Sequence, residues 1–269
     1  MKLIRFGKQG EEKPGILLSN DEKIDVSSFV SDYDEKFFES GGLVNLKNWL
    51  NENESSAPRL DDSIRLGSPI ARPSKIICIG LNFKDHAAES GFDAPEEPLI
   101  FGKATSAICG PYDNIIIPRG SEQTDWEVEL GVVIGKKTSY VDQDQALDHV
   151  GGYVLHNDVS ERAFQKDRGG QWIKGKSADT FAPMGPFMAT PDEIDNISDM
   201  RMWLNVNGEN MQDGNTSNLI FSVDHVVSYL SQFMTLLPGD VISTGTPAGV
   251  GMGMKPEKYL KPGDVVELG

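Results

Sequence analysis

Two apolar stretches that carry acidic residues constrain this chain most. Residues 125–135 read DWEVELGVVIG and residues 153–158 read YVLHND. Both are rich in Val, Leu and Ile, which favours buried β-strands. Side chains two residues apart in a strand point to the same face, so Glu127 and Glu129 are predicted to project together. The alternate apolar side chains then face the opposite way.

A third acid, Asp158, ends the second stretch. If the two strands pair, Asp158 joins Glu127 and Glu129 in one cluster of oxygen ligands. Close carboxylates repel one another, and a buried carboxylate is costly without a partner. A divalent cation is the simplest remedy, and ligands that are all oxygen favour Mg²⁺, Mn²⁺ or Ca²⁺. The alternative is that both glutamates lie on the solvated face of an amphipathic strand.

The composition argues against several classes of protein. A net charge of −16 disfavours nucleic acid or an anionic membrane as a partner, while a small anionic substrate needs only a few basic side chains in the site. The two cysteines form no disulfide framework or metal-binding spacing. The N-terminus lacks the apolar core of a signal peptide, and no run has transmembrane length. We therefore expect a cytoplasmic protein.

A polar segment divides the 269 residues into two parts. Residues 51–62 have the composition of a linker. Before it, we expect a small N-terminal α+β domain over residues 1–69, with an early hairpin and a helix over residues 41–50. After it, we expect a mainly β catalytic domain over residues 70–269. The N-terminal part has no recognisable catalytic constellation.

Further elements are predicted in the second part. Short apolar runs predict strands, the Asn207-Gly208 pair predicts a hairpin turn, and Ser222 is a candidate helix N-cap. The helix after Ser222 carries an apolar stripe that extends to Phe233. The predicted strands span residues 75–80, 99–103, 115–118, 187–190 and 202–205, and a helix is predicted over residues 142–150.

Two pairs of polar residues are candidates for catalysis. His86 and Glu89 are three apart in a predicted short helix and share a face. A carboxylate beside an imidazole raises its basicity and fixes its tautomer, as a general base requires, although such pairs are also common surface contacts. Arg162 and Gln165 have the same spacing soon after Asp158.

Two glycine-containing loops have features of anion sites. The basic loop over residues 168–177 suggests anion binding in an acidic protein, with a flexible solvated connection as the alternative. The Gly/Thr loop over residues 243–251 lets amides and hydroxyls approach a carboxylate, but it lacks the lysine of a nucleotide-binding loop. Lys103 ends a predicted strand and faces either solvent or the acids.

Together these motifs resemble the fumarylacetoacetate hydrolase family over roughly residues 70–269. Their order and spacing are most similar to bacterial members that act on 2,4-diketo-3-deoxy sugar acids, acylpyruvates or related 2-oxo acids. Phe83 stands where many members have tyrosine, and the family usually continues past the equivalent of Gly269. The motifs that carry the resemblance are Gly80-Leu81-Asn82-Phe83 with His86 and Glu89, Glu127-x-Glu129, Asp158, Arg162 with Gln165, Gly175-Lys176-Ser177 and Thr244-Gly245-Thr246-Pro247.

The resemblance implies a mixed β roll around a central metal site, preceded by a small N-terminal domain, in a homodimer. It implies a Mg²⁺-dependent hydrolase, in which Mn²⁺ or Ca²⁺ can replace Mg²⁺, that cleaves a C–C bond of a 2,4-diketo acid through a metal-stabilised enolate. The alternatives are an oxaloacetate-type decarboxylase, a keto–enol isomerase and a non-catalytic metal-stabilised binding protein. The implied roles are metal ligation by Glu127, Glu129 and Asp158, water activation by His86 and Glu89, charge stabilisation by Arg162, Gln165 and Lys176, and substrate binding by Thr246, to which we add Lys103.

Overall fold

A large mixed sheet organises the computed structural model, which describes residues 1–89, 91 and 93–269. In these residues the sheet has 11 strands, and the pairs β15–β5 and β12–β7 are parallel. The expected mainly β, mixed architecture is confirmed. Along the sheet the order is β3 (Lys23–Asp25), β2 (Lys13–Leu17), β1 (Lys2–Phe6), β12 (Ala182–Ala189), β10 (Val150–Asn157), β9 (Val128–Ile134), β15 (Val241–Ser243), β5 (Ile76–Gly80) and β6 (Leu99–Lys103), with β4 (Leu66–Gly67) on β1 and β7 (Ile108–Cys109) on β12.

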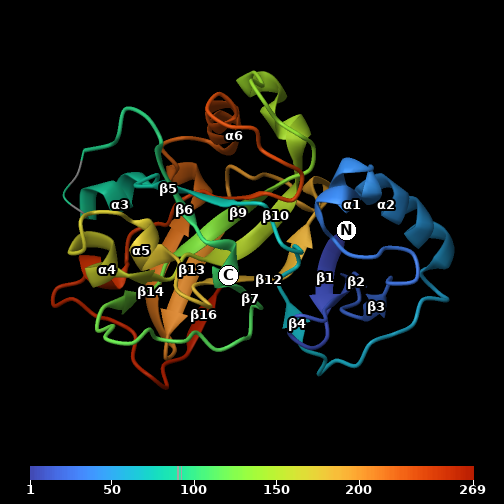
Figure 1. Ribbon diagram of the computed structural model, residues 1–269, viewed down its shortest axis with the longest axis horizontal. Helices are drawn as coiled ribbons and strands as arrows, with labels where there is room; N and C mark the ends of the chain where they lie inside the picture. Colours follow the sequence, from blue (N-terminus) through green and yellow to red (C-terminus); the bar gives the residue numbers. More distant parts are fainter. Residues whose placement is uncertain (90, 92) are drawn as a thin grey trace.

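Two smaller sheets and short helices complete the fold (Figure 1). The helices α3, α4 and α5 lie at the end of the molecule opposite α1 and α2. None of the helices in the described residues is both long and apolar enough to cross a membrane. The strands are β14 (Glu209–Asn215), β13 (Arg201–Val206), β16 (Val266–Leu268), β11 (Ser160–Glu161) and β8 (Thr124–Asp125), and the helices are α1 (Glu35–Glu39), α2 (Gly42–Asn53), α3 (Lys84–Glu89), α4 (Arg162–Lys166), α5 (Ile173–Lys176) and α6 (Val223–Ser231), with 3₁₀ turns η1 (Thr105–Ala107), η2 (Gln143–His149), η3 (Pro191–Glu193), η4 (Thr216–Asn218) and η5 (Gly251–Gly253).

Strand β9 separates two apolar cores, as its alternating sequence predicts. Val128, Leu130 and Val132 pack into the core beneath β13 and α6. Val133 faces the other core, which lies against the N-terminal elements. Glu129 lies on the same face as Val133 because the two residues are four apart in the strand. The acidic face of β9 is therefore inside the protein.

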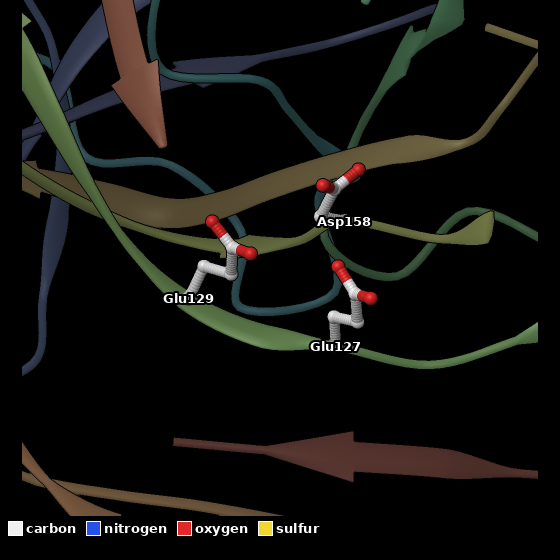
Figure 2. Close-up of side chains that lie close together, drawn as sticks. All are labelled: Glu127, Glu129 and Asp158. Atoms are coloured by element: carbon white, nitrogen blue, oxygen red, sulfur yellow. The ribbon is translucent and has the colours of Figure 1, made fainter. Parts of the chain in front are cut away.

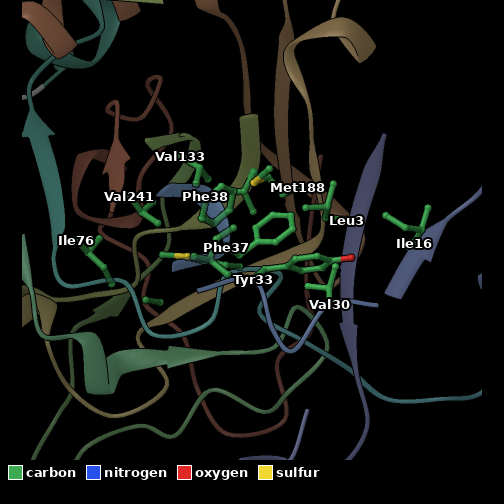
Figure 3. Close-up of a cluster of buried hydrophobic side chains, with 14 of the residues drawn as sticks. Leu3, Ile16, Val30, Tyr33, Phe37, Phe38, Ile76, Val133, Met188 and Val241 are labelled. Atoms are coloured by element: carbon green, nitrogen blue, oxygen red, sulfur yellow. The ribbon is translucent and has the colours of Figure 1, made fainter. Parts of the chain in front are cut away.

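The N-terminal elements share this second core and the large sheet. Leu3 on β1 pairs with Met188 on β12 in antiparallel register. Figure 3 shows Leu3 and Tyr33 in the same apolar cluster as Val133 and Val241, which belong to β9 and β15. The two parts of the chain are thus continuous in both sheet and core, and the division at residue 69 stays a prediction.

Several expected elements differ from those in the structure. Residues 115–118 form no strand, and the Ile116 N–H donates to the Thr180 hydroxyl at 2.8 Å in place of a neighbouring strand. The helix expected over residues 142–150 is the 3₁₀ turn η2. Phe233 lies beyond the end of α6 with 61% of its surface exposed, so it is not part of the buried stripe.

Other elements are confirmed. The Asn207-Gly208 turn connects β13 and β14, and Ser222 is the N-cap residue of α6, with Val223, Val226 and Leu230 buried. The strand expected over residues 187–190 begins earlier, at Ala182. Its first half could not be predicted from the sequence, because it contains two prolines, at positions 183 and 186, and proline is rare within strands.

The shared core predicts that the N-terminal elements stabilise the whole chain. Leu3 is fully buried, so Leu3→Ala is expected to cost about 2–5 kcal/mol in a single global unfolding transition. Val44→Ala is the control, because Val44 is 65% exposed on α2. Denaturant unfolding with EDTA present measures both. If unfolding instead showed two transitions and Leu3→Ala shifted only one of them, residues 1–69 would be an autonomous domain.

Candidate metal centre and active site

Three acidic side chains converge between strands β9 and β10. Glu127, Glu129 and Asp158 each offer one oxygen, and these oxygens lie within 4.8 Å of one another. The register pairs Glu129 with His156, and the Asp158 N–H donates to the Glu127 carbonyl at 2.9 Å. This pairing of two strands brings Asp158 opposite Glu127, as the sequence predicts. Figure 2 shows the three side chains lying close together.

Buried basic side chains contact two of the three acids. Lys176 Nζ lies 2.6 Å from Glu127 Oε2 and 2.8 Å from Asp158 Oδ2. Lys103 Nζ lies 2.5 Å from Asp158 Oδ1, so Lys103 faces the acids and not solvent. Arg162 contacts Glu127 Oε1 at 2.7 Å. Burial alone would raise the pKa of Asp158, but the two lysines hold it below its usual value.

Glu129 differs from the other two acids because the described residues supply it with no basic partner. Its Oε2 accepts hydrogen bonds from the Ser243 hydroxyl at 2.5 Å and from Gly245 N–H at 2.9 Å. Burial, followed by the nearby Asp158 and Glu127 carboxylates, raises the pKa of Glu129 well above its usual value. A cation beside Glu129 would remove this penalty.

The charge balance of the cluster is compatible with one divalent ion. Among the described residues, four buried carboxyl groups meet three buried basic side chains, so one negative charge is in excess when all four carboxyl groups are ionised. A carboxylate has about four lone-pair sites, so oxygens already bonded to lysine can also ligate an ion. A dication would turn the excess into one positive charge, which suits an anionic substrate. The carboxylates are those of Asp125, Glu127, Glu129 and Asp158, and the bases are Lys103, Arg162 and Lys176.

The proposed charge-stabilising residues surround the cluster. Arg162 and Gln165, one turn apart on α4, are joined by a hydrogen bond of 3.1 Å from Nη1 to Oε1. Arg162 Nε also donates to Asp125 at 2.8 Å. Lys176 ends α5, and its Nζ lies 5.0 Å from the centre of the Phe101 ring. Opposite charges from Asp158 and Glu127 outweigh burial and raise the pKa of Lys176, which keeps it protonated.

The predicted pair on α3 is formed. His86 Nδ1 lies 3.4 Å from Glu89 Oε2, and His86 is buried. Glu89 also accepts from the Gly249 N–H at 3.1 Å. The described contacts include none between this pair and the three acids. The pair is linked to them through the Gly/Thr loop, because Gly249 of this loop donates to Glu89 and Gly245 donates to Glu129.

Strand β9 and the residues just before it hold this Gly/Thr loop by consecutive contacts. Trp126 Nε1 donates to the Gly249 carbonyl at 3.0 Å, and the Leu130 carbonyl accepts from Thr244. Asp125 accepts from the N–H groups of Gly251 at 2.7 Å and Met252 at 3.1 Å. The loop and the acidic strand are therefore fixed relative to each other.

Sequence reasoning missed three residues that support the acids. Asp125 joins Arg162 to the Gly/Thr loop. His156 Nδ1 lies 2.6 Å from the Ser243 hydroxyl, and that hydroxyl donates to Glu129. Burial lowers the pKa of His156 to about 3, so its ring is neutral. A histidine inside an apolar strand, as in YVLHND, was the available signal for this support.

The raised pKa of Glu129 predicts a pH dependence of the metal-free protein. A carboxyl whose folded pKa is raised makes its full contribution to stability below its unfolded pKa of about 4.3, and loses that contribution as pH rises from there through the folded pKa. Glu129→Gln cannot ionise. Its stability relative to wild type is therefore expected to grow with pH above about 4.3, by up to about 1.4 kcal/mol per pH unit.

Denaturant unfolding in EDTA between about pH 5 and pH 8 measures this difference. The exposed Glu122→Gln is the matched control and is expected to follow wild type. With Mn²⁺ in place of EDTA, wild type gains stability and Glu129→Gln gains little. A difference that is independent of pH would contradict an un-ionised, cation-free Glu129.

Comparisons with known proteins show what the whole chain is similar to. The family model described as fumarylacetoacetate (FAA) hydrolase C-terminal matches residues 75–269. A protein of Burkholderia multivorans, whose name assigns it only to the hydrolases, is 50% identical over 100% of this chain and 95% of its own length.

Solved structures share the whole fold. The fumarylacetoacetate hydrolase of Exiguobacterium antarcticum has a TM-score of 0.86 at 36% identity, covering 100% of this chain and 95% of its own. A maleylpyruvate hydrolase from Sphingobium sp. SYK-6, solved with manganese(II) and pyruvate, has a TM-score of 0.82 at 27% identity, with coverage of 100% and 94%. On the family match and these full-length similarities, the chain belongs to the fumarylacetoacetate hydrolase family.

Proposed function

We propose that this protein is a divalent-metal-dependent hydrolase that cleaves a C–C bond in a 2,4-diketo acid, such as an acylpyruvate. The observation that carries the proposal is the buried trio of acids with one unpaired carboxylate, Glu129, among the described residues. The similarity to a maleylpyruvate hydrolase solved with manganese(II) and pyruvate supports the choice of a 2-oxo acid.

The donor set suits Mg²⁺, Mn²⁺ or Ca²⁺, because Glu127, Glu129 and Asp158 supply only oxygen. When bound, such an ion would act as a Lewis acid on the oxygens of a 2-oxo acid and stabilise the enolate released by C–C cleavage. The positive excess that the ion leaves in the cluster favours a substrate with a carboxylate. We also propose, from the family resemblance, that the protein works as a homodimer.

The general base in this proposal is His86. Its Nδ1 faces Glu89, so Nε2 is the nitrogen left to take a proton from water. The hydroxide formed attacks the carbonyl remote from the acid end. Glu89 in turn is held by the Gly249 N–H, which fixes the orientation of the pair.

Basic and polar side chains around the acids stabilise the charge that develops. Arg162, Gln165 and Lys176 are the proposed donors to the oxyanion. Thr246 and Lys103 are proposed to hold the substrate carboxylate. Lys103 uses two of its three ammonium hydrogens on Asp158 and the Val159 carbonyl, which leaves one for a ligand.

Loss of one acid tests the metal assignment. Glu127→Ala is expected to weaken Mn²⁺ binding and to abolish metal-dependent turnover, because it removes a ligand and leaves Arg162 and Lys176 without their shared partner. Isothermal titration with Mn²⁺, paired with turnover before and after EDTA, measures both. Glu122→Ala, at an exposed site in the same segment, is the control. Unchanged Mn²⁺ affinity in Glu127→Ala would remove Glu127 from the ligand set.

Loss of the base separates the reactions that this site could support. His86→Gln is expected to lower acylpyruvate hydrolysis by about 10²–10⁴-fold, because hydrolysis needs an activated water. Decarboxylation of oxaloacetate needs no hydroxide, so any such activity should survive the change.

Assays of both substrates with Mg²⁺ or Mn²⁺ make the comparison. His225→Gln, on α6 in a stack with Phe221, is the matched control. Wild-type protein that decarboxylates oxaloacetate but does not hydrolyse acylpyruvates would overturn the hydrolase assignment. Activity only in keto–enol conversion would favour the isomerase.

A further inference from the structure

Gln212 has a buried side-chain amide and belongs to none of the metal-binding, catalytic or substrate-binding motifs. It lies on β14, with 1% of its surface exposed. Its Oε1 accepts from the Val128 N–H at 2.9 Å, in the strand that carries the acids. Its Nε2 donates to the Thr246 hydroxyl at 2.7 Å and to the Pro247 carbonyl at 2.8 Å. One side chain therefore joins the acidic strand to the Gly/Thr loop.

Backbone groups determine which way this amide points. The Val128 N–H can only donate, so it must face the amide oxygen. The Pro247 carbonyl can only accept, so it must face the amide nitrogen. A flipped amide would place two donors together at Val128 and two acceptors together at Pro247. Both hydrogens of the amide are used, one by Thr246 and one by Pro247.

The fixed amide determines the role of the Thr246 hydroxyl. Since Gln212 donates to it, Thr246 Oγ1 acts as the acceptor in that bond, and its own hydrogen is left for another group. Within residues 1–89, 91 and 93–269, the hydroxyl has no protein acceptor for that hydrogen. Thr246 is buried, so a hydrogen without an acceptor is costly unless a ligand or water accepts it.

Close packing keeps the loop in this position. A Cβ at Gly249 would collide with the Met211 carbonyl, and one at Gly214 would collide with the Pro247 ring. The residue before Thr246 donates to Glu129 at 2.9 Å. Thr246 therefore directly follows a residue that is hydrogen-bonded to the acid cluster.

We propose that Gln212 is a positioning residue that makes the Thr246 hydroxyl a hydrogen-bond donor to the anionic end of the substrate. The ligand class is a carboxylate, which accepts this hydrogen and cannot donate one in return. The inference rests on the proposed function and assigns the selection of an anionic group to a residue on a different sheet from the metal ligands. Gln212 has no contact with the substrate in this proposal.

The variant Gln212→Glu replaces the donor that faces Thr246 with an acceptor and changes the shape of the side chain little. A carboxylate at position 212 still accepts from Val128, but it has no hydrogen for Thr246. The Thr246 hydroxyl then donates to the introduced carboxylate in place of the substrate's, so the KM for an acylpyruvate is expected to rise on the order of 10-fold, with a smaller change in kcat. Thr246→Val is expected to raise KM by a similar factor, because it removes the same donor.

The double variant separates capture of this hydrogen from simple charge repulsion. If Gln212→Glu acts through Thr246, adding Thr246→Val raises KM no further. Additive effects of the two changes would overturn the proposal, because they would mean that the introduced carboxylate repels the substrate directly.

Gln212→Met provides the matched structural control. It leaves Val128 and Pro247 unpaired, so it is expected to lower the unfolding temperature, as Gln212→Glu is. It cannot capture the Thr246 hydrogen, so its KM is expected to stay nearer to wild type. A KM that follows the unfolding temperature across the variants would show a structural role alone and overturn the proposal.

The same assays distinguish this proposal from the proposed function. If wild-type protein with Mn²⁺ neither hydrolyses acylpyruvates nor binds oxalate, the proposed function fails and this inference fails with it. If wild type is active and Gln212→Glu leaves KM unchanged, only the assignment of Gln212 fails.

Discussion

The structure depends on a buried cluster of charges that its own side chains balance incompletely. Glu127 and Asp158 share Lys176, while Glu129 is bonded only to a hydroxyl and an amide N–H among the described residues. Burial of such a carboxylate is unfavourable unless it is protonated or a cation joins it. The fold accepts this cost where β9 and β10 pair, in the centre of the large sheet. A buried carboxyl group without a basic partner at such a site is better explained by ligand binding than by stability.

The strand that carries the acids also holds the loop that completes the site. Asp125, Trp126 and Leu130 contact the Gly/Thr loop directly, and Val128 reaches it through Gln212. Hydrogen bonds therefore fix the strand of the proposed metal ligands relative to the loop of the proposed carboxylate-binding hydroxyl. Such rigidity favours catalysis, because a preorganised site needs little rearrangement when charge develops.

Sequence periodicity predicted the parts of this arrangement that depend on local geometry. The alternation in β9 predicted that Glu127 and Glu129 share a face, and the spacing of His86 and Glu89 predicted their contact. The roles of Gln212 and Ser243 could not be predicted, because their partners are 84 and 114 residues away along the chain. For the same reason, the sequence could not decide whether Lys103 faces solvent or the acids. In the structure it contacts Asp158. The extent of the sheet could not be predicted for the same reason. The polar composition of residues 51–62 indicated a linker between two domains, but β1, before this segment, pairs with β12, after it.

The choice between hydrolysis and simpler reactions then depends on how the base is held. Glu89 bonds both to His86 and to Gly249, which belongs to the loop fixed by the acidic strand. The orientation of the base is thus linked to the residues proposed to bind the metal and the substrate carboxylate. Decarboxylation requires no activated water and so no base held in this way, whereas hydrolysis and keto–enol conversion both require a positioned base. The bonded pair on α3 therefore favours the proposed hydrolysis over decarboxylation, and it suits keto–enol conversion equally.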